Sequence, residues 1–311
     1  MTFDQIRSFY LIAVLGTFAQ AARRMNTTQP GISARIAALE SHLNVKLFDR
    51  AGQRATLTNE GRRFLRSAEK LLEIQSEILT ETGAGQLTEV VRIGVSDTMA
   101  VTWVPGFLAD LRQAFPDIFI ELSTGPSFQI RDGLVERQLD VGFMVGPVSD
   151  PGIVNHILCD CPMVMAAPPA MNLHQVPLSS AQLEKLHLVT FERDTRPYQE
   201  LLAGLRQAGL SPRINPVNSL RALTMLICKG FGVGVLPLAA IEQEVSDAEL
   251  VLLDSPLKLS DIRFAACFPE GPDTWPARLI TDRAVRYLHK MEPSPAIKVI
   301  ATQPDGGVSA S

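Results

Sequence analysis

The sequence of 311 residues lacks an apolar run that could cross a membrane or direct export. Its longest apolar stretch, residues 223–241, is interrupted by Lys229, Pro237 and three glycines, whereas a spanning helix needs about 20 largely apolar residues. The first ten residues carry Asp4 and lack the basic start of a secretory signal. We therefore expect a cytoplasmic protein, with free thiols at its four cysteines, Cys159, Cys161, Cys228 and Cys267.

Signals of catalysis and of cofactor binding are also missing. The five histidines show no metal-ligand spacing, no Gly-x-Ser-x-Gly elbow occurs, and no carboxylate pair can be placed from the sequence. The glycines at 230, 232 and 234 follow an expected helix and precede an expected strand, the wrong order for a dinucleotide site. Cys159 and Cys161 would share one face of a strand, either as a redox or metal pair or as two buried thiols, and we favour the thiols. We expect no enzyme activity, no metal and no cofactor.

Positive charge is scarce outside the N-terminal quarter. Residues 1–70 contain eleven Lys and Arg against five Asp and Glu, whereas residues 71–311 contain eighteen against twenty-eight. The formal charge of −4 for the whole chain therefore combines a basic head with an acidic body. We expect only the head to contact nucleic acid. A hydrophobic content of 46% is ample for a buried core in the body.

Apolar residues recur at helical spacing through the head, and a tight turn at residues 26–28 separates two short helices. Ile32, Ile36 and Leu39 would bury one face of the second helix. Its N-terminal end would then expose Gln29, Pro30, Ser33 and Arg35, and such an end fits the major groove of DNA. Arg50 and Arg54, on a loop between two short extended segments, would form a wing that grips the DNA backbone.

Residues 21–40 (AARRMNTTQPGISARIAALE) closely resemble the DNA-binding domain of LysR-type transcriptional regulators. The resemblance extends through residues 43–50 (LNVKLFDR) and 57–61 (LTNEG), and residues 230–237 (GFGVGVLP) resemble a segment of the family's effector domain. Two departures are conservative, since Thr28 replaces the usual Ser and Asn44 the usual Gly. The alternative is a helix-turn-helix fragment in an unrelated protein. The residues that we expect to contact DNA are Thr28, Gln29, Pro30, Ser33, Arg35, Arg50 and Arg54.

A long helix is expected from about residue 59 to residue 82, with apolar residues seven apart. Such a repeat is typical of a helix that packs along another helix, and the alternative is an amphipathic helix lying on its own domain. The resemblance implies a dimerising linker helix and a homodimer or homotetramer. The residues that we expect in the dimer contact are Phe64, Leu65, Leu71, Leu72, Ile78 and Leu79.

From residue 90 onward, strands alternate with helices, which predicts an α/β body with a parallel sheet. The resemblance implies that this body is an effector domain like a periplasmic binding protein, with two lobes around a ligand. It implies a winged helix-turn-helix at 1–58, a linker helix and hinge at 59–88, and an effector domain at 89–300. Lobe I would comprise 89–161 and 262–300, and lobe II 162–261. Residues 301–311, small and polar, would be disordered.

Ligands of such sheets bind beyond the carboxyl ends of the strands, beside helix N-termini. Two expected strand-to-helix junctions, at residues 96–98 and 124–127, offer hydroxyl and N–H groups that would hold a carboxylate. We therefore expect the ligand to be a small organic acid. Arg193 is the favoured charged anchor, with Arg131, Arg196 and Arg221 as rivals. Asp97 favours instead a hydroxylated or zwitterionic ligand. The residues that we expect to contact the effector are Ser96, Asp97, Thr98, Thr124, Gly125, Ser127, Phe143, Val145, Phe191, Arg193, Asn218 and Ser219.

These observations predict a regulator that binds promoter DNA and responds to a small molecule, without membrane contact. Two other classes remain as alternatives: a small-molecule-binding protein of the periplasmic type without DNA activity, and a hydrolase or transferase. The first leaves the basic head unexplained, and no constellation of residues supports the second.

Overall fold

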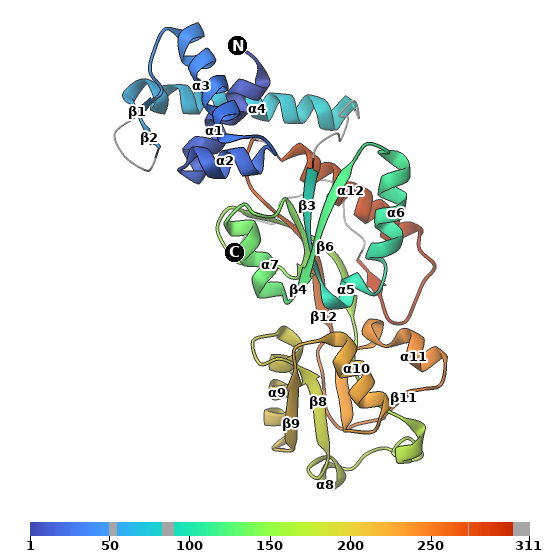
Figure 1. Ribbon diagram of the computed structural model, residues 1–311. Coiled ribbons are helices and arrows are strands. Elements are labelled where there is room, and N and C mark those ends of the chain that lie inside the picture. Colours follow the sequence, from blue (N-terminus) through green and yellow to red (C-terminus); the bar gives the residue numbers. More distant parts are fainter. Residues whose placement is uncertain (50–54, 83–89, 273, 301–311) are drawn as a thin grey trace. The chain divides into compact units, whose positions relative to one another are not determined.

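The computed structural model describes residues 1–49, 55–82, 90–272 and 274–300. Two compact units divide the chain, the first formed mainly by residues 1–91 and the second mainly by residues 92–268. Figure 1 shows the first unit as helices in blue and cyan, and the second as sheets with flanking helices in green to red. Within the described ranges, no helix combines the length and apolarity that crossing a bilayer requires.

The first unit is a helical bundle with a small hairpin. Helices α1 (Phe3–Leu15), α2 (Phe18–Arg24) and α3 (Gln29–Leu43) are followed by the antiparallel strands β1 (Phe48–Asp49) and β2 (Thr56–Leu57), and then by helix α4 (Asn59–Thr82). The order agrees with the predicted winged helix-turn-helix and long linker helix. The loop between the strands, with Arg50 and Arg54, lies outside the described residues, as do residues 83–89 and 301–311.

Local capping explains where α3 begins and ends. The hydroxyl of Thr28 accepts a hydrogen bond from the backbone N–H of Gly31 at 3.2 Å. A Cβ at position 31 would lie 3.0 Å from Oγ1 of Thr27 and 3.3 Å from Oγ1 of Thr28, so glycine leaves room for this cap. At the other end, Asn44 adopts the left-handed conformation (φ 53°, ψ 35°) that Asn tolerates better than most residues.

An aromatic cluster forms the centre of the first unit's core. The ring of Phe9 lies 5.2 Å from that of Phe48 and 4.9 Å from that of Phe64, measured between centroids. Ile32, at the buried face of α3, is fully covered in the same core. Aromatic pairs at these separations contribute stability beyond the area they bury, so the hairpin and α4 are both fastened to α1.

Glu40 joins α3 to the hairpin from a buried position, with 5% of its surface exposed. Its carboxylate accepts hydrogen bonds from the backbone N–H groups of Leu47 (2.8 Å) and Phe48 (3.3 Å) and from Nζ of Lys46 (2.7 Å). Burial alone would raise the pKa of Glu40, but these hydrogen bonds and the Lys46 charge hold it below its usual value. The ionised side chain therefore stabilises the base of the hairpin.

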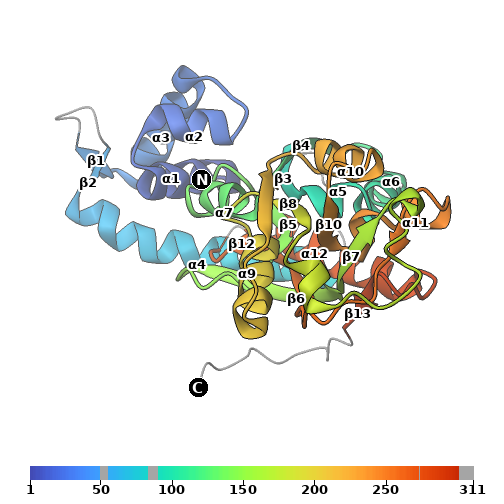
Figure 2. The same cartoon turned by 90° about the horizontal axis from the view of Figure 1, so that it is seen from below.

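Helix α4 uses its apolar residues in two ways, and Figure 2 shows it alongside α1. Leu72 is buried in the core of its own unit, and Phe64, Leu65 and Leu71 pack against that core. Ile74 and Ile78, by contrast, are each 53% exposed. Packing on the helix's own domain therefore accounts for the first part of α4. The expected contact with a second copy stays a prediction, carried by the residues beyond Leu72.

The second unit contains two mixed β-sheets joined by crossing segments. The six-stranded sheet has the order β13-β6-β12-β5-β3-β4, and the five-stranded sheet has the order β11-β7-β10-β8-β9. The strands are β3 (Val90–Ser96), β4 (Phe119–Gly125), β5 (Val141–Val145), β6 (Ile153–Cys161), β7 (Met163–Ala167), β8 (His187–Phe191), β9 (Arg213–Val217), β10 (Val233–Pro237), β11 (Val251–Leu252), β12 (Ile262–Pro269) and β13 (Lys298–Val299).

The expected parallel pairing is present in both sheets, but each sheet also contains antiparallel pairs. Strands β3 and β5 are parallel, as are β8 with β9 and with β10, but β12 pairs antiparallel with β5, and β7 antiparallel with β10. The chain leaves the six-stranded sheet after Cys161 and re-enters it at Ile262. Strands β7 and β12 follow these crossings directly, without a helix that would bring the chain back along the sheet. A parallel pairing needs such a connection, so β7 and β12 run antiparallel to their neighbours β10 and β5.

Helices pack on these sheets and begin near the strand ends. They are α5 (Asp97–Ala100), α6 (Val104–Ala114), α7 (Ser127–Val135), α8 (Ser180–Leu183), α9 (Arg196–Ala208), α10 (Leu220–Cys228), α11 (Glu242–Ser246) and α12 (Trp275–Lys290). On the six-stranded sheet, the ring of Phe143 lies 5.4 Å from Trp103 and 5.7 Å from Phe107. On the five-stranded sheet, Leu223 and Ile227 of α10 are fully buried. These cores hold the strand ends in place.

Candidate functional site

Two parts of the molecule bring together the residues singled out from the sequence. The first is the N-terminal end of α3, where Thr28, Gln29, Pro30 and Ser33 are exposed. Gln29 and Ser33 are four residues apart and so share one exposed side of the helix, next to the stripe that Ile32, Ile36 and Leu39 bury. Arg35 is half-buried, with Nη1 3.8 Å from Sδ of Met25. A helix held by one face with polar groups at its free N-terminal end can be inserted into a DNA groove.

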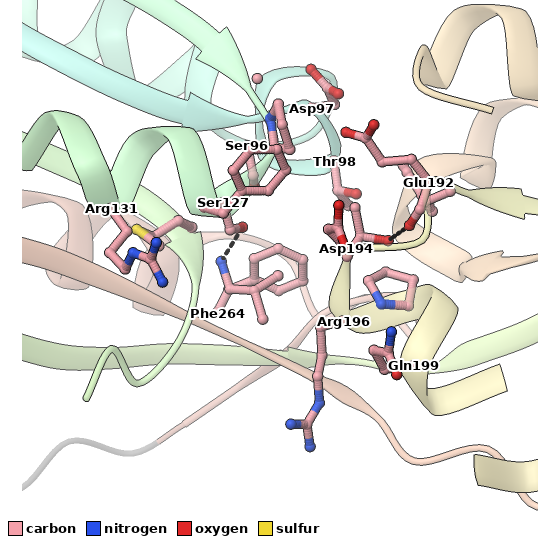
Figure 3. Close-up of a pocket in the computed structure, with 18 of the residues that line it drawn as sticks. Ser96, Asp97, Thr98, Ser127, Arg131, Glu192, Asp194, Arg196, Gln199 and Phe264 are labelled. Carbon is pink, nitrogen blue, oxygen red and sulfur yellow. Dashed lines mark hydrogen bonds between the residues drawn. The ribbon is translucent and has the colours of Figure 1, made fainter. Parts of the chain in front are cut away.

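The second part is a pocket in the second unit, with a volume of about 430 Å³ (Figure 3). It lies where strands β3, β5, β8 and β9 end and where α5, α7 and α9 begin. The six-stranded sheet supplies one wall and the five-stranded sheet the other. Of the expected effector contacts, the structure places eight in the lining: Ser96, Asp97, Thr98, Gly125, Ser127, Val145, Phe191 and Asn218.

The other four expected contacts lie outside this lining, for identifiable reasons. Thr124 is exposed on the edge strand β4. Phe143 is fully buried, deeper in the sheet than Val145, against Trp103 and Phe107. The guanidinium group of Arg193 lies over the ring of Tyr198, 5.8 Å from its centroid. Ser219 caps α10 by accepting a hydrogen bond from Ala222.

The structure adds residues that the sequence did not single out. Most are neighbours of expected positions, and a wider window around each strand end would have included them. Phe264 comes instead from β12, far along the chain, and no sequence pattern pointed to it. Arg131 and Arg196, the rivals of Arg193, both line the pocket. Pro126 and Glu192, which fall within the strand-end segments expected to face the pocket, also line it. The added residues are Phe128, Met144, Pro147, Val148, Ser149, Asp150, Asp194, Thr195, Pro197, Gln199, Val217 and Phe264.

Hydrogen-bonding groups are concentrated at one wall of the pocket. The hydroxyl of Ser127, at the start of α7, accepts a hydrogen bond from the N–H of Val145 at 3.1 Å and can still donate its own proton. The hydroxyl of Ser96 is buried and has no hydrogen-bond partner among the described residues. The start of α7 also lines the pocket, and a helix N-terminus presents N–H donors without a partner inside the helix. This wall can bind an oxygen-bearing ligand.

Six charged side chains also line the pocket, and carboxylates outnumber guanidinium groups. The acids are Asp97, Asp150, Glu192 and Asp194, and the bases are Arg131 and Arg196. Burial raises the pKa of the Asp97 carboxyl above its usual value. The closest partner of Arg131 is Asp132 at 2.7 Å, with Asp150 at 3.9 Å, and Arg196 pairs with Glu200 at 2.7 Å.

The cysteines support the interpretation as buried thiols. A hydrogen bond with Cys159, together with burial, raises the pKa of the Cys161 thiol far above its usual value. Burial also raises the pKa of Cys267, to about 12. Thiols with raised pKa values are poor nucleophiles and poor metal ligands at neutral pH. Among the residues that the structure describes, no group of His, Cys, Asp and Glu side chains could hold a metal ion.

Comparison with known proteins agrees with this arrangement. Residues 3–62 match the model for the bacterial regulatory helix-turn-helix protein of the lysR family, and residues 84–280 match the LysR substrate binding domain. The chain is 31% identical over 278 residues to the HTH-type transcriptional regulator TfdS of Cupriavidus pinatubonensis. That alignment covers 85% of this chain and 94% of TfdS.

Two solved structures show the same fold. Full-length OxyR from Pseudomonas aeruginosa superposes with a TM-score of 0.65 at 20% identity, covering 98% of this chain and 99% of that one. Full-length CbnR, complexed with its target DNA, superposes with a TM-score of 0.50 at 21% identity, covering 92% and 100%.

Proposed function

Because the chain belongs to the LysR family of transcriptional regulators, we propose that α3 reads promoter DNA and that a small organic acid in the pocket controls this activity. The observation that carries the proposal is the coexistence of two sites in one chain. One is an exposed helix end with Gln29 and Ser33, and the other is a pocket at converging strand ends. An effector can change DNA binding only if it binds two arrangements of the protein with different affinities. Such control requires both an effector site and a DNA-binding site in the same protein.

Each exposed residue of the DNA-reading end has a specific task. Gln29 is suited to a bidentate contact with an adenine edge, and Ser33 to a single hydrogen bond with a neighbouring base. Thr28 and Pro30 shape the helix start next to the phosphates. Arg35 contacts a base or a phosphate, and Arg50 and Arg54 grip the backbone from the hairpin. Fluorescence anisotropy with the DNA upstream of the protein's own gene and with random DNA tests this assignment.

For the effector, the hydroxyl of Ser96, the hydroxyl of Ser127 and the start of α7 would hold a carboxylate. Replacing Ser96 by alanine is expected to weaken a bound acid by about 1 kcal/mol or more, the usual scale for a lost buried hydrogen bond. The same change removes a buried hydroxyl without a partner among the described residues, so the protein without ligand should not lose stability. Calorimetric titration of the full chain with a panel of small acids and their neutral amides measures both effects. Tight binding of the amides alone would exclude a carboxylate effector.

We further propose that two copies associate through the distal part of α4 and that two such dimers form a tetramer. Residues 1–58, 59–88 and 89–300 would then be the DNA-binding domain, the linker and the effector domain, with lobes as expected from the sequence. A twofold dimer presents two copies of α3, so the DNA site should be an interrupted palindrome.

The exposed apolar residue Ile74 provides the test of this association. Ile74→Glu would place a charge in an apolar contact and should halve the mass measured by light scattering, with loss of tight binding to a two-site operator. Lys70→Glu introduces the same side chain at an exposed position of the same helix and serves as the control. An unchanged mass for Ile74→Glu would remove this part of α4 from the interface.

A further inference from the structure

The charge of the pocket does not suit a ligand that is only an acid. Four carboxylates line it against two guanidinium groups, so its lining carries an excess of negative charge. Both guanidinium groups already have acidic partners, Asp132 for Arg131 and Glu200 for Arg196. A dianion placed here would meet uncompensated repulsion, because charges act strongly over short distances in a partly enclosed site.

Three of the four carboxylates have no hydrogen bond or ion pair from a side chain among the described residues. These are Asp97, Glu192 and Asp194, whereas Asp150 lies 3.9 Å from Arg131. Asp97 follows β3 and comes from the six-stranded sheet, and Glu192 and Asp194 follow β8 and come from the five-stranded sheet. Figure 3 shows the three groups toward one end of the pocket and Arg131 away from them. Like charges on facing walls repel until a cation lies between them.

Ser96 is an independent sign that the pocket is built for a ligand. It is adjacent to Asp97 in the chain, only 5% of its surface is exposed, and its hydroxyl has no partner within the described residues. A buried polar group without a partner costs stability, so it is retained where a bound molecule supplies the missing hydrogen bond. Ser96 and Asp97 both line the pocket, so a donor without a partner and an unpaired carboxylate stand next to each other in the chain.

Resting on the effector pocket proposed above, we propose that its ligand carries a cationic nitrogen as well as an acid group, with the nitrogen held between Asp97 and the pair Glu192 and Asp194. The acid group binds at Ser96, Ser127 and the start of α7. Between the two ends, Phe128, Phe191 and Phe264 supply apolar surface for the carbon skeleton. The ligand class is thus an amino acid or a related amino-carboxylate. By neutralising carboxylates on both walls, its nitrogen favours the closed arrangement of the lobes.

The test uses three probes that share one skeleton: terephthalate, 4-(aminomethyl)benzoate and p-xylylenediamine. These carry two acids, one acid with one amine, and two amines. The five-carbon series glutarate, 5-aminopentanoate and 1,5-diaminopentane repeats the comparison without a ring. Calorimetric titration of the full chain at neutral pH, with millimolar probe, should show the amino-carboxylate of at least one series binding more tightly than its diacid.

Asp97→Asn should weaken the amino-carboxylate by about tenfold or more, as expected for losing a charge-assisted hydrogen bond. The diacid should be unaffected or bind more tightly to this variant. Asp247→Asn, in which an exposed aspartate outside the lining is replaced, serves as the matched control and should leave all affinities unchanged. Without ligand, Asp97→Asn should melt at a slightly higher temperature than the wild type, because a carboxylate that lacks a partner in the fold is replaced.

The possible outcomes separate this inference from the proposed function. Binding of diacids only, with no loss in Asp97→Asn, overturns the cationic nitrogen and leaves the organic-acid effector standing. Binding of no probe in either series overturns both. A lower melting temperature for Asp97→Asn would show that its carboxylate is tied into the fold, which contradicts a role in holding a ligand.

Discussion

Replacing Glu40 by alanine is expected to lower the free energy of unfolding of the first unit by about 2–4 kcal/mol, a large fraction of the stability of a small unit. The change leaves the buried N–H groups of Leu47 and Phe48 without their acceptor and releases Lys46. The base of the hairpin should open and DNA binding should be lost with it. Chemical denaturation of the full chain, followed by circular dichroism of the helices, measures the loss.

Glu40→Gln is the matched variant, because it keeps the size and one acceptor oxygen but loses the charge. It should cost less than the alanine change. The folded-state pKa of Glu40 lies below its usual value of about 4.5, so the stability from its ionised form is complete above that value and is lost as the pH falls through the folded-state pKa. The difference between wild type and Glu40→Gln should therefore shrink with acid. A difference that grows with acid would contradict the assigned hydrogen bonds.

Gln29→Ala is expected to weaken binding to the cognate operator by about 1–3 kcal/mol per half-site while hardly changing binding to random DNA. Gln29 is exposed at the N-terminal end of α3, so the variant should remain as stable as the wild type. Anisotropy titrations with both DNAs at one salt concentration measure the ratio.

Arg54→Ala is the informative control. Losing a contact with the DNA backbone should weaken binding to both the cognate and the random DNA, and it should make binding less dependent on salt concentration. An unchanged ratio of cognate to random binding in Gln29→Ala would mean that this end of α3 does not read bases.

The DNA-binding unit could be predicted well because its signals are local. Ile32, Ile36 and Leu39 lie within three helical turns, and the cap at Thr28 is adjacent to the turn, so one segment specifies the exposed face. The role of Glu40 could not be predicted in the same way. It looks like a surface residue of α3 until the backbone of Leu47 returns beside it, a contact that spacing does not encode.

The lining residues of the pocket could be predicted where they follow strand ends. They could not be predicted where the direction of a side chain determines whether it reaches the pocket. Ser96 lies at the end of β3 and Ser127 at the start of α7, and the hydrophobic pattern of the sequence predicts both elements. Phe264 reaches the pocket from the returning strand β12, which only the tertiary fold brings near. Arg193 was expected in the pocket, but it packs over Tyr198, and such a choice between rotamers leaves no trace in sequence spacing.

The long helix shows a third limit. The seven-residue repeat correctly predicted a long helix with an apolar face, but it did not show whether that face packs on a partner helix or on the protein's own core. Leu72 is covered by its own unit, whereas Ile74 is exposed. Packing on a partner helix and packing on the protein's own core bury the same types of residue. A single sequence therefore cannot distinguish the two kinds of packing.

Selection of DNA from a random pool by the full-length protein tests the central claim most directly, because it needs no knowledge of target genes or effector. Sequencing of the retained DNA should reveal an interrupted palindrome, with half-sites separated by one or more turns of the double helix. The same selection with Gln29→Ala should lose or alter bases within each half-site and leave the spacing unchanged. Retained DNA with no sequence in common would contradict the account, because α3 would then grip DNA without reading it.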